Sequence, residues 1–196
     1  MAGGRVSLGA VVLAAGAGRR LGGVAKALLT VDGVGFLARI VASAGHVGVA
    51  AADVVVVVGP PFTAEVTAAA TALGARVVIN PAPARGMASS VARGFAALAA
   101  HVDAAFLWPV DHPQVAVATL AQLIARGEGA PRYRDRGGHP PLVGRRWFAA
   151  LAAAEAHPDG ARGVLRGRLA AVPVDDPGVV RDVDTPADLA EAACAG

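Results

Sequence analysis

Short apolar runs rich in valine and alanine alternate with longer alanine-rich stretches, and this alternation limits the folds open to the chain more than any other feature. The runs are short, continuous and β-branched or aromatic, as expected of strands covered on both faces: residues 10–14, 54–58, 76–79 and 104–108. The stretches between and after them are long enough for crossover helices: residues 35–44, 62–73, 88–100 and 115–125. The pattern predicts an α/β fold, a three-layer αβα sandwich with a Rossmann-like, mostly parallel sheet.

The composition changes after residue 126, where glycine, proline and arginine dominate up to residue 141. Helical stretches at 145–156 and 161–169, a strand at 171–174 and a last helix after Pro186 are expected beyond that point. Neither an internal repeat nor a linker interrupts the 196 residues. We therefore expect a single domain over residues 1–196, in which 1–126 and 127–196 are two parts of one fold.

Composition excludes several classes of protein. Hydrophobic residues make up 55% of the chain, which is too many for a disordered protein. The single cysteine, Cys194, excludes a disulfide framework or a cysteine-based zinc or iron–sulfur site held by this chain alone, and it suits a reducing cytoplasm. Residues 6–17 superficially resemble a secretory signal, but Gly9 and Gly16 interrupt them. No uncharged apolar run of about 18 residues is present, so no membrane segment is expected.

A glycine-rich loop follows the first predicted strand. Gly16 and Gly18 permit backbone angles that let successive N–H groups converge on an anion, while Arg20 and Lys26 supply charge for phosphate oxygens. A dinucleotide-binding fingerprint would need glycine at the position of Leu21, and the chain has no Gly-Lys-Ser/Thr triplet of a Walker motif. The alternative is a flexible turn with solvated arginines. The net charge of +3 favours a phosphate-bearing ligand without indicating a nucleic-acid protein.

The loop and its flanks resemble the signature of the MobA-like nucleotidyltransferases, which attach nucleoside monophosphates to the molybdenum cofactor. The residues that carry the resemblance are Leu13-Ala14-Ala15-Gly16-x-Gly18-x-Arg20-x-Gly22 and then Lys26-Ala27-Leu28-Leu29. The resemblance implies the sheet type of the nucleotide-diphospho-sugar transferases, with 1–126 as the nucleotide-binding part and 127–196 as the acceptor-side part. It also implies that Leu13 to Gly16, Gly18, Arg20 and Lys26 bind the triphosphate, with Arg20 and Lys26 acting in catalysis.

Two acidic segments are candidates for a metal site. Asp111 comes just after the strand at 104–108, where a carboxylate is well placed to bind Mg²⁺ together with phosphate oxygens. The second segment is Asp182-Val183-Asp184-Thr185-Pro186. By resemblance the two segments meet around the ion, so Asp111 and Asp182 are the expected ligands and Asp111 is also expected to be catalytic. Thr185, followed by Pro186 and Asp188, instead predicts a helix N-cap.

The base-side segment is expected to contact the nucleotide through Asn80, Gly86, Met87, Ser89 and Ser90. These residues resemble the Asn-…-Gly-Met-x-Ser-Ser block of the molybdopterin cytidylyltransferase branch. A glycine that opens a helix with two hydroxyls in its first turn presents free N–H groups and donors to a phosphate or base. The alternative for each serine is an ordinary helix N-cap.

The acceptor side begins with Arg132, Arg134 and Arg136, which would lie on one face if this segment were a strand. His139 follows in a Gly-His-Pro block that resembles the family's, and His112 stands beside Asp111. We expect Arg134, Arg136 and His139 to bind the phosphate of the acceptor. His112 is expected to contact the acceptor, and the alternative is that it only fills the turn after Asp111. The alternative for the arginines is a solvated basic edge strand that blocks aggregation. Farther on, Gly160-Ala161-Arg162 resembles the end of a family segment, but only in part.

The function implied by the resemblance is Mg²⁺-dependent transfer of CMP or GMP from CTP or GTP to the terminal phosphate of the molybdenum cofactor, with release of pyrophosphate. The Gly-Met-x-Ser-Ser block favours CTP, and a molybdoenzyme or its maturation factor is a candidate partner. Two alternatives stay open: transfer to a sugar phosphate or another phosphorylated small molecule, and a non-catalytic module that binds and delivers a nucleotide or cofactor. Nucleic-acid binding is not expected, because only Tyr133 is available for stacking within the basic stretch.

Overall fold

The computed structural model describes residues 6–194, so the ends of the predicted domain, 1–5 and 195–196, lie outside the described residues. Its main sheet has five strands in the order β5-β4-β1-β6-β9. Their bounds are β1 Leu8–Leu13, β4 Val54–Val58, β5 Arg76–Ile79, β6 Ala104–Pro109 and β9 Leu142–Gly144. The first four are parallel, and β9 joins β6 antiparallel. The four predicted strands and their parallel arrangement are therefore confirmed.

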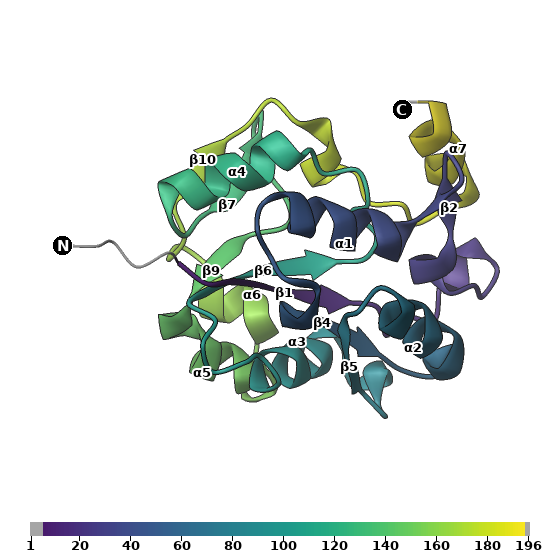
Figure 1. The fold of residues 1–196 in the computed structure, drawn as a ribbon, viewed down its shortest axis with the longest axis horizontal. Coiled ribbons are helices and arrows are strands. Elements are labelled where there is room, and N and C mark those ends of the chain that lie inside the picture. The colour runs from purple at the N-terminus through teal and green to yellow at the C-terminus, as the bar shows by residue number, and fades with distance from the viewer. Residues whose placement is uncertain (1–5, 195–196) are drawn as a thin grey trace.

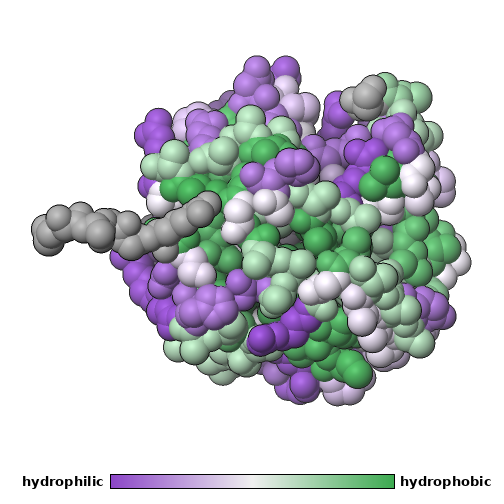
Figure 2. Space-filling model, viewed as in Figure 1, coloured by the Kyte–Doolittle hydropathy of each residue, from purple (hydrophilic) through white to green (hydrophobic). Residues whose placement is uncertain are grey.

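Helices cover both faces of this sheet, as the sequence predicts (Figure 1). One face packs against α1 (Phe36–His46), α2 (Thr63–Ala72) and α4 (Val117–Arg126). The other packs against α3 (Met87–Ala96), α5 (Phe148–Ala152) and α6 (Gly160–Leu165). Figure 2 shows the first of these sides, where hydrophilic and hydrophobic residues are interspersed on the surface. Among residues 6–194, no helix has both the length and the apolar character that a membrane crossing requires.

Strand β1 illustrates how the sequence makes this fold. It is buried along its whole length, and successive side chains point to opposite helical layers. Val12 packs in the cluster with α1, whereas Val11 and Leu13 pack in the cluster with α3. A continuous apolar run is therefore what a central strand of a three-layer sandwich needs.

The part after residue 126 is less regular than predicted. The helical stretch expected at 145–156 is three short pieces: the 3-10 turns Arg145–Trp147 and Ala154–Ala156, with α5 between them. Helix α6 ends at Leu165 rather than at 169, and β10 spans Ala171–Pro173. Strand β9 also comes from this part and completes the main sheet. A strand of three residues is too short to give a recognisable pattern in the sequence.

The arginine-rich stretch is a hairpin and not a single strand, so the condition under which its three arginines would share one face is not met. Strands β7 (Ala130–Tyr133) and β8 (Arg136–Gly137) pair antiparallel, and β10 joins β7 to complete a second sheet. Arg134 has a φ of +52° in the connecting turn. Because the chain reverses between Arg132 and Arg136, their alternation does not create one continuous face.

The C-terminal helix α7 (Pro186–Cys194) begins with the predicted cap. The Asp188 N–H donates to the Thr185 hydroxyl at 3.2 Å, and the Asp188 carboxylate accepts from the Thr185 N–H at 2.7 Å. The Thr185 hydroxyl also donates to the Asp188 carboxylate at 2.8 Å, and this bond, followed by those from the N–H groups of Asp184 and Thr185, holds the pKa of Asp188 below its ordinary value. In Figure 1, α7 lies beside the hairpin of β2 (Thr30–Val31) and β3 (Val34–Gly35).

Candidate active site

The glycine-rich loop begins at the carboxyl end of β1, between the ends of two neighbouring strands. The Ala14 N–H donates to the Val57 carbonyl at 2.9 Å, and the Val110 N–H donates to the Leu13 carbonyl at 3.2 Å. Residues that follow β1, β4 and β6 therefore converge here, as expected at the carboxyl edge of a parallel sheet.

Gly18 closes the loop and cannot be replaced without strain. Its φ is +56°, and a Cβ there would lie 1.9 Å from the Val24 carbonyl oxygen. Its own carbonyl accepts from the N–H groups of Leu21 and Gly23 at 2.9 and 3.0 Å. Gly16 differs, because its φ is not in the left-handed region and a Cβ would meet no neighbour within 4 Å. Glycine at position 16 therefore leaves open space at the loop, whereas Gly18 determines its shape.

Lys26 lies at the centre of a charged cluster beside the glycine-rich loop, formed with Asp111, Asp184 and Arg20. Its Nζ is 3.4 Å from Asp111 Oδ2 and forms an ion pair with Asp184, which also pairs with Arg20. The Lys26 side chain is 15% exposed and the Arg20 side chain 74% exposed. The arrangement thus has a sheltered lysine between two carboxylates and an arginine that reaches into solvent.

The two acidic segments meet, as the sequence predicts. The Val183 N–H donates to the Asp111 carbonyl at 2.9 Å, which joins the segment before α7 to the end of β6. Asp184 is the residue of the Asp-x-Asp pair that forms the ion pair with Lys26, and the metal role of Asp182 stays a prediction. Asp182 is exposed and lines a separate cavity of about 170 Å³ together with Arg136. The sequence does not single out Asp184, because no local signal distinguishes the two carboxylates of an Asp-x-Asp pair.

Asp111 offers an oxygen suited to a cation. Its Oδ1 atom is buried and has no hydrogen-bond partner. Within residues 6–194, no cluster of three or more histidine, cysteine, aspartate or glutamate side chains is close enough to enclose a metal ion. Two carboxylates without such a cage fit a hard divalent cation that takes its remaining ligands from water and from substrate phosphates.

Asn80, Ser89 and Ser90 form a buried network. The Asn80 amide nitrogen donates to both serine hydroxyls, at 2.8 and 2.9 Å, and its amide oxygen accepts from the Ala82 N–H at 3.1 Å. The Ser89 hydroxyl also donates to the Gly86 carbonyl at 2.8 Å. The exposed fractions are only 1%, 2% and 6% for Asn80, Ser89 and Ser90. The network fixes the segment between β5 and α3, and it leaves little of these side chains for direct contact with a nucleotide.

The two predicted acceptor histidines lie together beside Asp111. The ring centroids of His112 and His139 are 5.0 Å apart, and the Nδ1 atom of each is buried without a partner. His112 Nε2 lies 3.9 Å from Asp111 Oδ1. Burial, with a further contribution from His112, lowers the pKa of His139 from 6.5 to about 4. The His139 ring is therefore neutral at pH 7 and available to accept or donate one hydrogen bond.

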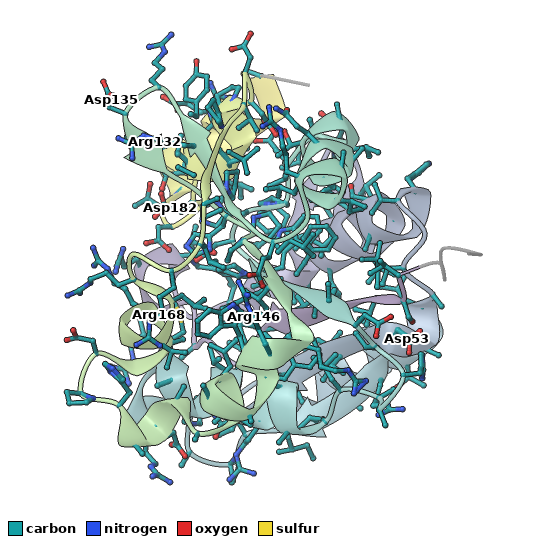
Figure 3. The ribbon with its side chains drawn as sticks, turned by 90° about the vertical axis from the view of Figure 1, so that its left-hand side faces the viewer. Asp53, Arg132, Asp135, Arg146, Arg168 and Asp182 are labelled. Carbon is teal, nitrogen blue, oxygen red and sulfur yellow. The ribbon has the colours of Figure 1, made fainter. Side chains whose placement is uncertain are left out.

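The predicted acceptor arginines, Arg134 and Arg136, contact residues outside the charged cluster of Lys26 and Asp111. The Arg134 guanidinium lies over the Tyr133 ring, 5.1 Å from its centroid, and Arg136 donates to the Val180 carbonyl at 3.3 Å. Arg132 donates to the Asp135 carbonyl across the same turn. Figure 3 shows Arg132 and Asp135 at the tip of the hairpin, with Asp182 nearby. An acceptor role for Arg134 and Arg136 remains a prediction.

Three adjoining cavities meet at the charged cluster. The loop cavity, about 790 Å³, is bounded by residues 15–20, Lys26, Asp184 and two proline-rich segments at 60–61 and 81–84. The central cavity, about 230 Å³, shares Gly16 and Lys26 with it and contains Asp111. The arginine cavity, about 820 Å³, shares Leu13, Met87 and Pro109 with the central one. Two large compartments thus open on either side of a small one that holds the sheltered lysine and a carboxylate.

Comparison with known proteins identifies the family. Residues 10–174 match the family model described as the MobA-like NTP transferase domain. The chain belongs to this family. A search of curated protein sequences gives no significant match.

Solved structures share the fold of this chain. Rv0371c from Mycobacterium tuberculosis H37Rv is 30% identical with a TM-score of 0.80, over 96% of this chain and 98% of that one. A second structure of Rv0371c, in complex with manganese, is 28% identical with a TM-score of 0.74, over 97% and 100% of the two chains. This MobA-like chain therefore resembles a protein whose structure is known with a bound divalent ion.

Two more distant structures support the fold alone. A nucleotidyl transferase from Methanothermobacter thermautotrophicus is 23% identical with a TM-score of 0.77, over 96% of this chain and 97% of that one. Molybdopterin-guanine dinucleotide biosynthesis protein A from Archaeoglobus fulgidus is 17% identical with a TM-score of 0.66, over 97% and 98%. The sandwich of this MobA-like chain is thus a nucleotidyltransferase α/β fold.

Proposed function

We propose that this chain transfers a nucleoside monophosphate, CMP in the first instance, from a nucleoside triphosphate to the terminal phosphate of a molybdenum-cofactor acceptor. An oxygen of the acceptor phosphate attacks the α-phosphorus in line, a new P–O–P bond forms, and the bond to pyrophosphate breaks. The single observation that carries the proposal is Lys26 between Asp111 and Asp184, where the loop and central cavities join.

The loop cavity is the proposed site of the triphosphate. Gly16 leaves room for phosphate oxygens to approach the main chain, while Lys26 and Arg20 supply positive charge. In the free protein both cations pair with Asp184, so the incoming triphosphate replaces a carboxylate as their partner. The same two side chains stabilise the departing pyrophosphate, because charge accumulates on it as the bond breaks.

The proposed metal ligands are Asp111 and Asp184. The unpartnered Oδ1 of Asp111 supports its role, and Asp184 replaces Asp182 as the second carboxylate because it shares Lys26 with Asp111. These two carboxylates would hold a divalent cation, Mg²⁺ or Mn²⁺, which would supply positive charge against the negative charge of the transition state. The protein itself supplies no nucleophile in this scheme, so its residues act by positioning and charge neutralisation.

The base-side segment is proposed to contact the nucleotide mainly through its backbone. Asn80, Ser89 and Ser90 hold that segment, and Gly86 and Met87 stand at the start of α3 beside the central cavity. The motif resemblance to the cytidylyltransferase branch supports CTP over GTP. The name of the Archaeoglobus protein supports a molybdopterin-type acceptor.

A thermal-shift panel tests the proposal. The full chain is mixed with each of the four ribonucleoside triphosphates, with and without Mg²⁺, because a ligand that binds the native state raises the apparent Tm by mass action. CTP with Mg²⁺ is expected to give the largest rise. A largest rise with GTP would change the nucleotide but keep the reaction, whereas no metal-dependent rise with any triphosphate would overturn the proposal. Pyrophosphate release on adding acceptor then distinguishes an enzyme from a module that only binds.

A further inference from the structure

A fourth large cavity lies beside α1. It has a volume of about 590 Å³, and none of its described lining residues belongs to the loop, central or arginine cavity. Its walls come from α1, from the β2–β3 hairpin, from residues 113–117 and from residues 176–181. We call this space the α1 cavity. Its size is within the range of sites that bind small molecules, so its side chains indicate what it could hold.

One part of the wall of the α1 cavity is apolar although it is open to solvent. Val34 is 44% exposed and Val117 is 37% exposed. Val115, Pro113 and Pro177 extend this apolar wall. Covering exposed apolar side chains removes apolar surface from water, so the wall favours a ligand with an apolar body.

The acidic side chains of the α1 cavity already have partners. Asp176 is buried, and its carboxylate accepts from two main-chain N–H groups, both at 2.9 Å, and from the Thr119 hydroxyl at 2.7 Å. The other carboxylate, that of Asp32, pairs with Arg39 at 2.9 Å. These two carboxylates therefore have little capacity left to attract a cation into the cavity.

Arg181 supplies the unpaired charge of the α1 cavity. It is exposed, and its guanidinium forms neither an ion pair nor a hydrogen bond with any residue in the described part of the chain. A free guanidinium presents a fork of donors that matches a carboxylate. One such group balances one negative charge, whereas a phosphate monoester carries about 1.5 to 2 at pH 7. The chemistry of the cavity thus favours a monocarboxylate with an apolar body.

Two walls of the α1 cavity continue into the acidic segments of the active site. Gln114 is three residues beyond Asp111, and Arg181 is three residues before Asp184. The two walls also touch each other, because a Cβ on Gly178 would lie 2.3 Å from the Gln114 carbonyl oxygen. A ligand in the α1 cavity therefore contacts the segments that carry the two carboxylates without entering a substrate cavity.

We propose that the α1 cavity is a second binding site, which takes a small organic monocarboxylate. Arg181 binds the carboxylate, and the apolar body of the ligand covers Val34 and Val117. Occupation of the site shifts the segment from Asp111 to Gln114, since that segment forms part of the wall. The site goes beyond the proposed nucleotidyl transfer: it gives a molecule other than a substrate a place from which to act on the catalytic carboxylates.

Calorimetry on the full chain tests the site with matched probes. Cyclohexanecarboxylate has both the anion and the apolar body, cyclohexanecarboxamide lacks the charge, and acetate lacks the body. We expect cyclohexanecarboxylate to bind at least about tenfold more tightly than either of the other two, because each of them loses one of the two contacts. Cyclohexyl phosphate, which keeps the body but carries a second charge, should bind more weakly than the carboxylate.

Three variants locate the bound probe. Arg181→Ala should weaken cyclohexanecarboxylate by roughly tenfold or more, the usual effect of removing a charged hydrogen-bond partner, and Arg181→Lys should weaken it less. Val117→Asp places a carboxylate in the apolar wall and should weaken the probe by a similar factor. The fold tolerates this change, because Val117 is the first residue of α4 and an acidic side chain is favoured at a helix N-terminus. Arg126→Ala, at the exposed end of the same helix, is the matched control and should leave binding unchanged.

Trp108 reports the shift of the segment without any nucleotide. Its ring is buried, and its Nε1 donates to the His112 carbonyl at 2.9 Å, within the segment from Asp111 to Gln114. The chain has two tryptophans, so Trp147→Phe leaves Trp108 as the only one. In that variant, saturating cyclohexanecarboxylate should change the fluorescence of Trp108. Adding Arg181→Ala to the variant should abolish the change at the same probe concentration.

Several results would overturn the proposal. These are no binding of cyclohexanecarboxylate, equal binding of its amide, tighter binding of cyclohexyl phosphate, or equal affinity in the wild type and Arg181→Ala. Binding that depends on Arg181 but leaves the Trp108 fluorescence unchanged would contradict the shift of the segment. Because no probe or readout involves a nucleotide, these outcomes are independent of the test of nucleotidyl transfer.

Discussion

The loop cavity and the arginine cavity lie on either side of the same lysine, but they are built by different means. The loop cavity is made from main chain and charge: a glycine loop, an ion-pair cluster and a base-side segment held by a buried amide. The arginine cavity is made from apolar side chains of β1, β6, α3 and α6, with cations among them. The loop cavity suits a ligand that is bound through its polyphosphate group. The arginine cavity suits discrimination by the shape and polarity of the ligand body.

The largest effect should come from the carboxylates that face the loop cavity. In Asp184→Asn, Lys26 and Arg20 lose an anionic partner but the site also loses a metal-binding carboxylate. The ratio of CTP affinity with Mg²⁺ to that without it should therefore fall by roughly tenfold to a hundredfold, as measured by calorimetry. Asp182→Asn is the matched control, since Asp182 is exposed on another cavity. A fall in Asp182→Asn and none in Asp184→Asn would reassign the second carboxylate.

The buried amide network should make the loop side sensitive to a single polar substitution. Asn80→Ala leaves two serine hydroxyls and the Ala82 N–H without their partner, so the free energy of unfolding should fall by about 2–3 kcal/mol. Gln122→Ala removes a surface amide that donates to Pro173 and should cost at most about 0.5 kcal/mol. Urea unfolding measures both. Equal losses in the two variants would mean that Asn80 does not hold the base-side segment.

The pair of histidines beside Asp111, His112 and His139, predicts an acid sensitivity. The pKa of His139 is about 4 in the folded chain and 6.5 as its ordinary value, so the unfolded state binds more protons between these values. The contribution to stability is complete above pH 6.5 and is lost as the pH falls toward 4. From pH 7 to pH 5 the loss should be on the order of 2 kcal/mol.

Unfolding of His139→Gln at both pH values checks this prediction. The variant should lose less stability than the wild type on acidification, whereas His46→Gln, on the exposed end of α1, should behave like the wild type. An unchanged acid loss in His139→Gln would show that another group causes it.

The smallest effect should come from the N-cap of α7, whose hydrogen bonds hold Asp184 and Thr185 at the start of that helix. The Asp188 carboxylate accepts from the N–H groups of Asp184 and Thr185, and Asp188 is in turn held by the Thr185 hydroxyl. Thr185→Ala should lower the free energy of unfolding by about 1 kcal/mol. Thr71→Ala, at an exposed position of α2, should have little effect, and thermal unfolding compares the two. Similar behaviour of both variants would deny the cap a stabilising role.

The difference between the two cavities also explains what the sequence predicts. The strands, the glycine loop and Asp111 depend on residues adjacent in the chain, and local patterns such as a buried valine run or a carboxylate after a strand identify them. The family assignment rests on the same local motifs. The irregular part after residue 126 is different: the helix expected at 161–169 is present in shortened form as α6, whereas β9 depends on its pairing with β6, which no local pattern encodes.

Three features of the site are not encoded in local sequence patterns, for physical reasons. Asp182 and Asp184 are the same residue type in the same motif, so the sequence does not distinguish them. Only the ion pair with Lys26 indicates that Asp184 belongs to the charged cluster. Asn80 is indistinguishable from a ligand-binding amide until its hydrogen bonds to Ser89 and Ser90 are known. The hairpin turn at Arg134 depends on a positive φ at a residue that rarely adopts one, so the alternation of arginines resembles a strand.

The central claim is that Asp111 binds a divalent cation beside a triphosphate held by the glycine loop. Electron paramagnetic resonance of free Mn²⁺, titrated with wild-type chain and with Asp111→Asn in the presence of CTP, tests it most directly. We expect the wild type to remove Mn²⁺ signal beyond what CTP alone removes, and Asp111→Asn to remove no more than CTP does. Equal removal of Mn²⁺ signal by the two proteins, with CTP bound to both, would contradict it.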